Sequence, residues 1–200
     1  MKRLILIRHG ETDYSASRRY CGFQDIPLNT RGIRQSHKLK DRLKKIKVDR
    51  VYSSNLKRCL ETAHIVFNDN LIYERKGLRE IDFGSLAGLK YDDLKKKYPG
   101  IYKLWEKHPE RLKMPKGEFL PAFARRVERC FDEIIKEGRG KAVAIVAHGG
   151  SIRIILLKLL KKGLDKMWEI EQNASALTVV DFTRGIPRVS KMNDTTHTRG

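Results

Sequence analysis

The chain has 200 residues, of which 40% are hydrophobic, so it is long enough to bury a core as one domain. Its 43 lysine and arginine residues against 24 aspartate and glutamate residues give a formal net charge of +19. No apolar run approaches the roughly 18 residues of a membrane-spanning helix, and the apolar run at the amino terminus has the length expected of a strand rather than the core of a signal peptide. We therefore expect a cytoplasmic protein, and the odd number and wide separation of Cys21, Cys59 and Cys130 agree with reduced thiols.

Three explanations exist for the excess of positive charge. The first is adaptation of the protein surface, because lysine-rich surfaces occur in proteins from hot environments and excess charge also keeps proteins in solution. A small anionic substrate is the second explanation, and a nucleic acid is the third. The basic residues are spread along predicted helices with few aromatic residues among them, so no surface for stacking bases is evident. We therefore expect neither a nucleic-acid partner nor a membrane partner.

The amino-terminal part of the chain predicts a strand followed by a helix. Residues 4–7 are all aliphatic and indicate a buried strand, which ends at Arg8 and His9. After a polar loop, Thr30 is expected to cap a helix that runs to about Ile46.

A second strand and helix are expected next. Residues 48–52 predict a short strand, and residues 53–55 are residue types that cap the helix that follows. In that helix Leu56 faces the core. Arg58 lies about 200° around the helix from Leu56, at about 100° per residue, and therefore points away from the core.

The middle of the chain carries a loop and an insertion. Residues 71–73 indicate a third short strand, and residues 78–88 form a glycine-bearing loop that contains Glu80. From residue 91 to about residue 116 the chain is polar and rich in lysine, and prolines interrupt any long helix. We expect a small helical insertion at about 89–120.

The carboxyl-terminal part repeats the pattern of the start. A helix is expected at 120–136, followed by a strand at 142–147 that ends in His148 and Gly149, and Ser151 can cap the next helix. Two further strands, at 176–182 and 186–192, are expected to form a hairpin. Residues 1–192 thus predict one domain, and residues 193–200 are expected to be a disordered tail.

The alternation of strands and helices predicts an α/β fold. We expect a three-layer α/β/α sandwich whose sheet is mostly parallel, with an antiparallel edge strand. Right-handed crossovers place the ends of successive strands at one edge of such a sheet. Four polar residues follow predicted strand ends, so we expect them to meet in one crevice. These residues are His9, Arg58, Glu80 and His148.

This combination of side chains suits phosphoryl transfer. The guanidinium groups of Arg8 and Arg58 match phosphate oxygens and stabilise charge in the transition state. A neutral His9 can attack phosphorus, while His148 donates a hydrogen bond to a phosphate oxygen. Glu80 can give a proton to the leaving oxygen and later take one from water.

Six segments, in chain order, resemble the histidine phosphatase superfamily in its phosphoglycerate mutase-like branch. They are LIRHGET at 6–12, DIPLNTRG at 25–32, SSNLKRCLETA at 53–63, LREIDFGSLAG at 78–88, GEF at 117–119 and AHGGSIR at 147–153. The resemblance implies that His9 is phosphorylated, that Arg8, Arg58 and His148 bind phosphate, and that Glu80 is the proton donor. It also implies that no metal and no cofactor is needed.

Further substrate contacts are expected at Gly149, whose amide begins a helix, and at Thr12. Family members commonly have asparagine and glutamine where this chain has Ser15 and Cys21, so these two are expected on the phosphate or substrate side with undefined roles.

We therefore expect a metal-independent phosphatase that hydrolyses small phosphomonoesters through a phosphohistidine. The length of the chain and the segment 115–118 resemble α-ribazole phosphatases, which makes α-ribazole 5′-phosphate a candidate substrate beside phosphoserine. A bisphosphoglycerate-dependent phosphoglycerate mutase is the first alternative, although its insertion is usually longer. A non-catalytic anion- or RNA-binding module is the second. The oligomeric state is open, and a homodimer is one option.

Overall fold

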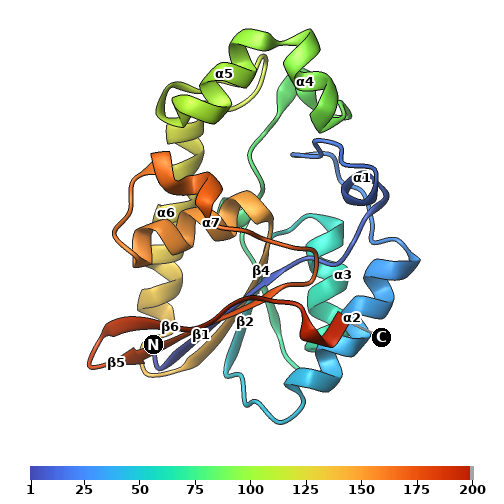
Figure 1. The fold of residues 1–200 in the computed structure, drawn as a ribbon. Helices are drawn as coiled ribbons and strands as arrows, with labels where there is room; N and C mark the ends of the chain where they lie inside the picture. The colour runs from blue at the N-terminus through green and yellow to red at the C-terminus, as the bar shows by residue number, and fades with distance from the viewer. Residues whose placement is uncertain (199–200) are drawn as a thin grey trace.

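A six-stranded sheet forms the centre of the computed structural model, which describes residues 1–198 (Figure 1). The strand order is β3-β2-β4-β1-β5-β6. The strands are β1 (Arg3–Arg8), β2 (Arg50–Ser53), β3 (Ile72–Glu74), β4 (Ala142–Ala147), β5 (Leu177–Thr183) and β6 (Ile186–Asp194). The first four strands pair in parallel, β5 is antiparallel to β1, and β6 is antiparallel to β5. The predicted mostly parallel sheet is confirmed.

Helices cover both faces of this sheet (Figure 1). They are α2 (Thr30–Leu43) and α3 (Lys57–Val66) on one face, and α6 (Leu120–Glu137) and α7 (Gly149–Leu159) on the other. Strand β1 contributes Ile5 and Ile7 to the core beneath α2 and α3, and Leu4 and Leu6 to the core beneath α6 and α7. All four side chains are fully buried, which explains why this strand is aliphatic at every position. The predicted three-layer sandwich is confirmed.

The insertion consists of α4 (Tyr91–Lys97), α5 (Pro99–Lys107) and the 3₁₀ turn η3 (Pro109–Arg111), at the end of the molecule beyond the carboxyl ends of β1 to β4 (Figure 1). Trp105 of α5 stacks on Trp168 of η4 (Leu164–Glu169), with ring centroids 4.5 Å apart. The indole N–H of Trp168 also donates to the carbonyl of Trp105 at 2.6 Å. These contacts connect the insertion to the body of the domain.

Four short elements complete the described chain, and none of its helices is long and apolar enough to cross a membrane. The short elements are α1 (Asp13–Ala16), η1 (Lys76–Leu78), η2 (Gly84–Leu86) and η5 (Thr196–Thr198).

The predicted cap of α2 is wrong. Asn29, not Thr30, is the N-cap, because its side-chain oxygen accepts the amide of Gly32 at 2.8 Å. The helix also ends at Leu43 rather than near Ile46.

The caps of α3 and α7 differ from prediction as well, because the polar side chains have other partners. Leu56 precedes α3 without a side-chain cap of its own, and the amide of Lys57 donates to the Asp25 carboxylate at 2.6 Å instead. The Ser54 hydroxyl lies 2.8 Å from a nitrogen of His148 and only 3.5 Å from the amide of Leu56. His148 itself is the N-cap position of α7. The hydroxyl of Ser151 donates to the carbonyls of Leu78 and Arg79, so it anchors the Glu80 loop instead of capping a helix.

The expected disordered tail is wrong for residues 193–198. Strand β6 extends to Asp194, whose carboxylate pairs with Arg42 of α2, and η5 follows. The hydroxyl of Ser175 lies 3.3 Å from Nε2 of His197. These long-range contacts tie the segment to the body, and residues 199–200 lie outside the described part of the chain.

Candidate active site

A cavity of about 840 Å³ lies at the carboxyl edge of the sheet, between the sheet and the insertion. The five side chains expected to carry the chemistry all line it. They are Arg8, His9, Arg58, Glu80 and His148.

The two histidines face each other because their strands are neighbours. Strands β1 and β4 pair in parallel, and Arg8 is in register with Ala147, so His9 and His148 follow at the same level of the sheet. Their ring centroids are 5.2 Å apart, with an angle of 64° between the ring planes. The expected meeting of both imidazoles in one crevice is confirmed.

His9 is held with one ring nitrogen free. Its Nδ1 lies 2.7 Å from the carbonyl oxygen of Gly10, and because that oxygen can only accept, Nδ1 carries the proton. Nε2 is then the unprotonated nitrogen. Burial lowers the pKa of His9 well below 6.5, and the charges of Arg58 and Arg8 lower it further. The ring is therefore neutral at pH 7, as a nucleophile must be.

His148 is the second buried imidazole, with 1% of its surface exposed. Its Nε2 lies 2.8 Å from the hydroxyl of Ser54, which follows β2, and 3.4 Å from the sulfur of Cys59. Burial, followed by Arg58, lowers the pKa of His148 well below 6.5. A neutral imidazole has one N–H, so His148 can donate one hydrogen bond.

Arg58 is buried although it lies off the core face of α3, because the loop before α2 covers it. The side chain is 1% exposed, and its two terminal nitrogens donate to the carbonyls of Gln24 and Gly22, each at 2.8 Å. Arg8 donates similarly to the carbonyl of Gln172 at 2.6 Å.

Both arginines keep a buried Nε–H without a hydrogen-bond partner. Neither Arg8 nor Arg58 forms an ion pair with any carboxylate of residues 1–198. Buried donors without a partner are costly, and so is the buried, unpaired charge of Arg58, which indicates a place for an anion.

Glu80 faces the amino-terminal end of α7. One carboxylate oxygen accepts the amide of Ile81 and the other accepts the amide of Gly150, both at 2.9 Å. This close approach requires a glycine, because a Cβ on Gly150 would lie 2.1 Å from the carboxylate of Glu80.

We therefore expect the substitution Gly150→Ala to lower kcat by about 10²-fold, the size of a general acid–base contribution. The added methyl group meets the movable end of the Glu80 side chain, so the melting temperature should change little. Gly100→Ala is the matched control, because a Cβ there has no neighbour within 4 Å. Equal kcat in Gly150→Ala and the wild type would contradict a catalytic role for the observed position of Glu80.

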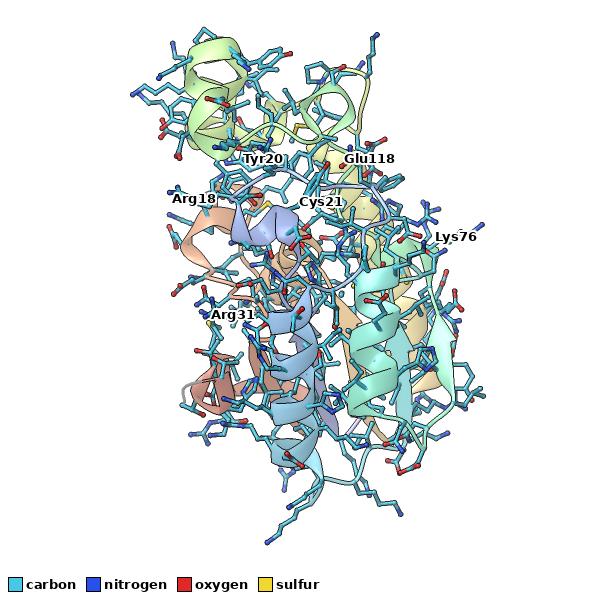
Figure 2. All side chains as sticks on the ribbon, turned by 90° about the vertical axis from the view of Figure 1, so that its right-hand side faces the viewer. Arg18, Tyr20, Cys21, Arg31, Lys76 and Glu118 are labelled. Carbon is cyan, nitrogen blue, oxygen red and sulfur yellow. The ribbon has the colours of Figure 1, made fainter. Side chains whose placement is uncertain are left out.

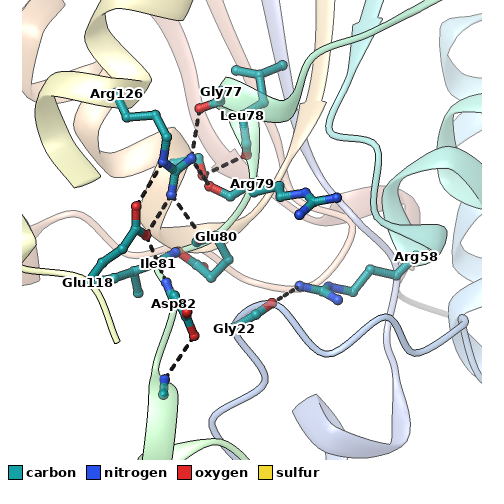
Figure 3. A network of polar contacts seen from close by, with 12 residues as sticks. Gly22, Arg58, Gly77, Leu78, Arg79, Glu80, Ile81, Asp82, Glu118 and Arg126 are labelled. Atoms are coloured by element: carbon teal, nitrogen blue, oxygen red, sulfur yellow. Dashed lines mark hydrogen bonds and ion pairs between the residues drawn. The ribbon is translucent and has the colours of Figure 1, made fainter. Parts of the chain in front are cut away.

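Arg126 holds the Glu80 loop from behind, and sequence reasoning missed it (Figure 3). Its guanidinium donates to the carbonyls of Gly77, Arg79 and Glu80 at 3.1 to 3.2 Å, and it pairs with Glu118 at 2.7 Å. The Glu118 carboxylate in turn accepts the amide of Asp82 at 2.9 Å. Glu118 belongs to the recognised GEF segment, which was the available signal.

The secondary substrate candidates also line the cavity. Thr12 and Ser15 form the capping box of α1, in which the side chain of each accepts the backbone amide of the other. Their hydroxyl groups are therefore less available to bind a substrate. The thiol of Cys21 contacts the carbonyl of Gln24 at 3.4 Å, and burial raises its pKa, so it is not an activated thiol. Figure 2 shows Arg18, Tyr20 and Cys21 between the sheet body and the insertion. Gly149 also lines the cavity.

The outer half of the cavity was not predicted. Aromatic rings from separate parts of the chain line it, and Tyr20 contacts Phe83, Tyr91 and Trp105 with centroids 4.4 to 5.5 Å apart. Arg153, one helical turn after Gly149, lines it too, and this i, i+4 spacing was the only sequence signal.

Within residues 1–198, no group of three or more histidine, cysteine, aspartate or glutamate side chains is arranged to hold a metal ion. Independence from metal remains a prediction.

Comparison with known proteins gives one family. The family model described as histidine phosphatase superfamily (branch 1) matches residues 4–195. Phosphoserine phosphatase 1 of Hydrogenobacter thermophilus is 30% identical over 98% of this chain and 94% of its own length. The adenosylcobalamin/alpha-ribazole phosphatase of Escherichia coli is 27% identical over 96% of this chain and 95% of its own length. The solved structure of Bacillus stearothermophilus YhfR superposes with a TM-score of 0.91 at 28% identity, covering 100% of both chains.

Proposed function

Because the chain belongs to the histidine phosphatase superfamily and is a phosphatase of small phosphorylated molecules, we propose that it hydrolyses phosphomonoesters through a phosphohistidine at His9. The observation that carries this proposal is a neutral, buried His9 beside two arginines, Arg8 and Arg58, whose buried Nε–H groups have no hydrogen-bond partner. The three cysteines, all unpaired, support a cytoplasmic location as part of the proposal.

Binding of the phosphate uses donors that the folded chain already presents. The free N–H groups of Arg8 and Arg58 take the phosphate oxygens, and His148 donates a further hydrogen bond. The amide of Gly149 at the start of α7 adds a donor where helix N-termini favour anions. Because backbone carbonyls fix both guanidinium groups, little reorganisation is needed as charge develops.

The reaction then proceeds in two displacements. Nε2 of His9 attacks phosphorus, the bond from phosphorus to the ester oxygen breaks, and Glu80 gives its proton to that oxygen. Water next attacks the phosphohistidine while Glu80 takes its proton, and inorganic phosphate leaves with His9 restored. Glu80 is suited to both steps because its carboxylate is fixed at α7 on the wall of the same cavity.

Turnover of p-nitrophenyl phosphate in excess EDTA tests the proposal of a metal-independent reaction. We expect kcat to stay within about twofold of its value without EDTA, because arginines supply the positive charge that a metal ion would otherwise provide. Loss of activity in EDTA that Zn²⁺ or Mg²⁺ restores would contradict the proposal.

The protonation of His9 gives a second prediction. Only the neutral ring attacks, so activity is lost as the pH falls through the lowered pKa of His9, not at an ordinary histidine value. In ¹H–¹⁵N spectra of the side chains, we expect His9 to be neutral and protonated on Nδ1 at pH 6.5. In Arg58→Met the midpoint should move to higher pH, because a neighbouring positive charge is removed. A half-protonated His9 at pH 6.5 in the wild type would contradict this account.

Two substrates follow from the names of the relatives, which include phosphoserine phosphatases and α-ribazole phosphatases. The aromatic rings of the outer cavity favour α-ribazole 5′-phosphate, since a heterocyclic base can pack against them. The arginines that line the same region, Arg18, Arg19 and Arg153, favour a leaving group with a negative charge, as in phosphoserine.

A further inference from the structure

Arg153 is a third arginine of the active-site cavity, and it lies beyond the phosphate-binding pair. Its Nε donates to the carbonyl of Ile170 at 2.7 Å, and its guanidinium lies over the ring of Trp168, 5.7 Å from the ring centre. The side chain is thus held at two points, and its two terminal nitrogens remain available to a ligand.

Arg153 forms no ion pair within the described residues. No carboxylate of residues 1–198 lies within 4.0 Å of its nitrogens. Burial is the main influence on the group, and it lowers the pKa of Arg153. The carboxylates of Glu80 and Glu171 act on this half-buried guanidinium only from beyond ion-pair distance, so a bound anion would supply the direct counter-ion that the fold does not.

Arg153 lies beside Arg8, at the border of the group that binds the transferred phosphate. A Cβ on Gly149 would lie 3.3 Å from Nη1 of Arg153 and 3.7 Å from Nε of Arg8, so both guanidinium groups flank Gly149. Arg8 and Arg58 are the cations that influence the pKa of His9, and Arg153 is not among them. Arg8 and Arg153 both act on Tyr91 of the insertion. Only Arg153 also lies over Trp168, whose ring stacks on Trp105 of the insertion, so it extends from the phosphate-binding pair toward the outer cavity.

We propose that Arg153 binds a carboxylate on the leaving group of the substrate. The inference rests on the proposed function and adds a substrate class to it, namely phosphorylated hydroxy acids or amino acids with a carboxylate near the ester oxygen. The planar fork of one guanidinium matches one planar carboxylate.

A second phosphate group fits this region less well than a carboxylate. Among the described residues no lysine lines the cavity, and the outer arginines have other partners. Arg18 lies 3.3 Å from Asp92, and Arg19 donates to the carbonyl of Gly88 at 2.7 Å. Glu106 also lines the cavity and would repel a dianion. Among Arg18, Arg19 and Arg153, only Arg153 keeps both terminal nitrogens available, which suits one planar carboxylate.

The test compares two substrates that differ only in the carboxylate, phosphoserine and phosphoethanolamine, with p-nitrophenyl phosphate as a third. We expect the wild type to prefer phosphoserine over phosphoethanolamine by about 10- to 100-fold in kcat/KM, the range of a hydrogen-bonded charge pair. In Arg153→Gln this preference should fall to less than about threefold, mainly through KM. The values for phosphoethanolamine and p-nitrophenyl phosphate should hardly change.

Two further variants complete the design. Arg153→Lys keeps the charge without the fork and should restore part of the preference. Arg125→Gln removes an exposed arginine of α6 that does not line the cavity, and it should keep the full preference.

Two results would overturn the proposal. An equal loss on all three substrates in Arg153→Gln would assign Arg153 to the transferred phosphate. A wild type that prefers α-ribazole 5′-phosphate to phosphoserine, with Arg153→Gln unchanged, would show that this subsite takes no anion. If the folded wild type hydrolyses none of these esters, including p-nitrophenyl phosphate, the proposed function itself fails, and the inference fails with it.

Discussion

Replacement of His9 by alanine should lower kcat on every phosphomonoester by at least about 10⁴-fold. Nε2 of His9 is unprotonated and has no hydrogen-bond partner on the described protein, whereas Nε2 of His148 contacts the hydroxyl of Ser54. The arginines stay in place in this variant because backbone carbonyls hold them, so the affinity for inorganic phosphate should remain within about tenfold of wild type.

Stopped-flow turnover and calorimetric titration with phosphate measure these two effects separately. His64→Ala, an exposed histidine of α3 outside the cavity, is the matched control and should keep full activity. A His9→Ala enzyme that retains more than about 1% of kcat would be inconsistent with nucleophilic catalysis by this residue.

The second large effect is expected for Glu80→Gln. On alkyl phosphates kcat/KM should fall by about 10³-fold, because an alkoxide leaves poorly without a proton. On p-nitrophenyl phosphate kcat/KM should fall by less than about tenfold, because p-nitrophenolate is a stable anion and leaves without a proton. Glutamine keeps the size of the side chain. Its NH₂ group, however, replaces one of the two oxygens that accept the amides of Ile81 and Gly150, so two donors then face each other.

A series of substrates with leaving groups of increasing basicity measures this effect. The dependence of kcat/KM on leaving-group basicity should be steeper in Glu80→Gln than in the wild type. If both enzymes give the same dependence, Glu80 does not act as the acid.

The central part of the site could be predicted from the sequence because its residues follow recognisable strands. The aliphatic runs of β1 and β4 each end in a histidine, and parallel pairing places the two ends together. Arg58 could be located relative to the core from helical periodicity alone. Its burial could not, because that depends on carbonyls of the loop that contains Gly22.

The outer cavity could not be predicted because its residues come from segments that are far apart in the sequence. Trp105 and Trp168 stack across 63 positions of chain, and no spacing rule relates them. The capping errors have a different origin. Ser54 and Ser151 are residue types that cap helices, but tertiary contacts with His148 and the Glu80 loop use their hydroxyl groups instead.

The most direct test of the account is to quench Glu80→Gln in alkali during turnover of p-nitrophenyl phosphate and to locate the bound phosphate by mass spectrometry. In this variant the first displacement needs no acid, whereas the second lacks its base, so the intermediate should accumulate. We expect a burst of one p-nitrophenol per active site and an acid-labile phosphate on His9. Turnover without a phosphorylated His9, or with the phosphate on another residue, would contradict it.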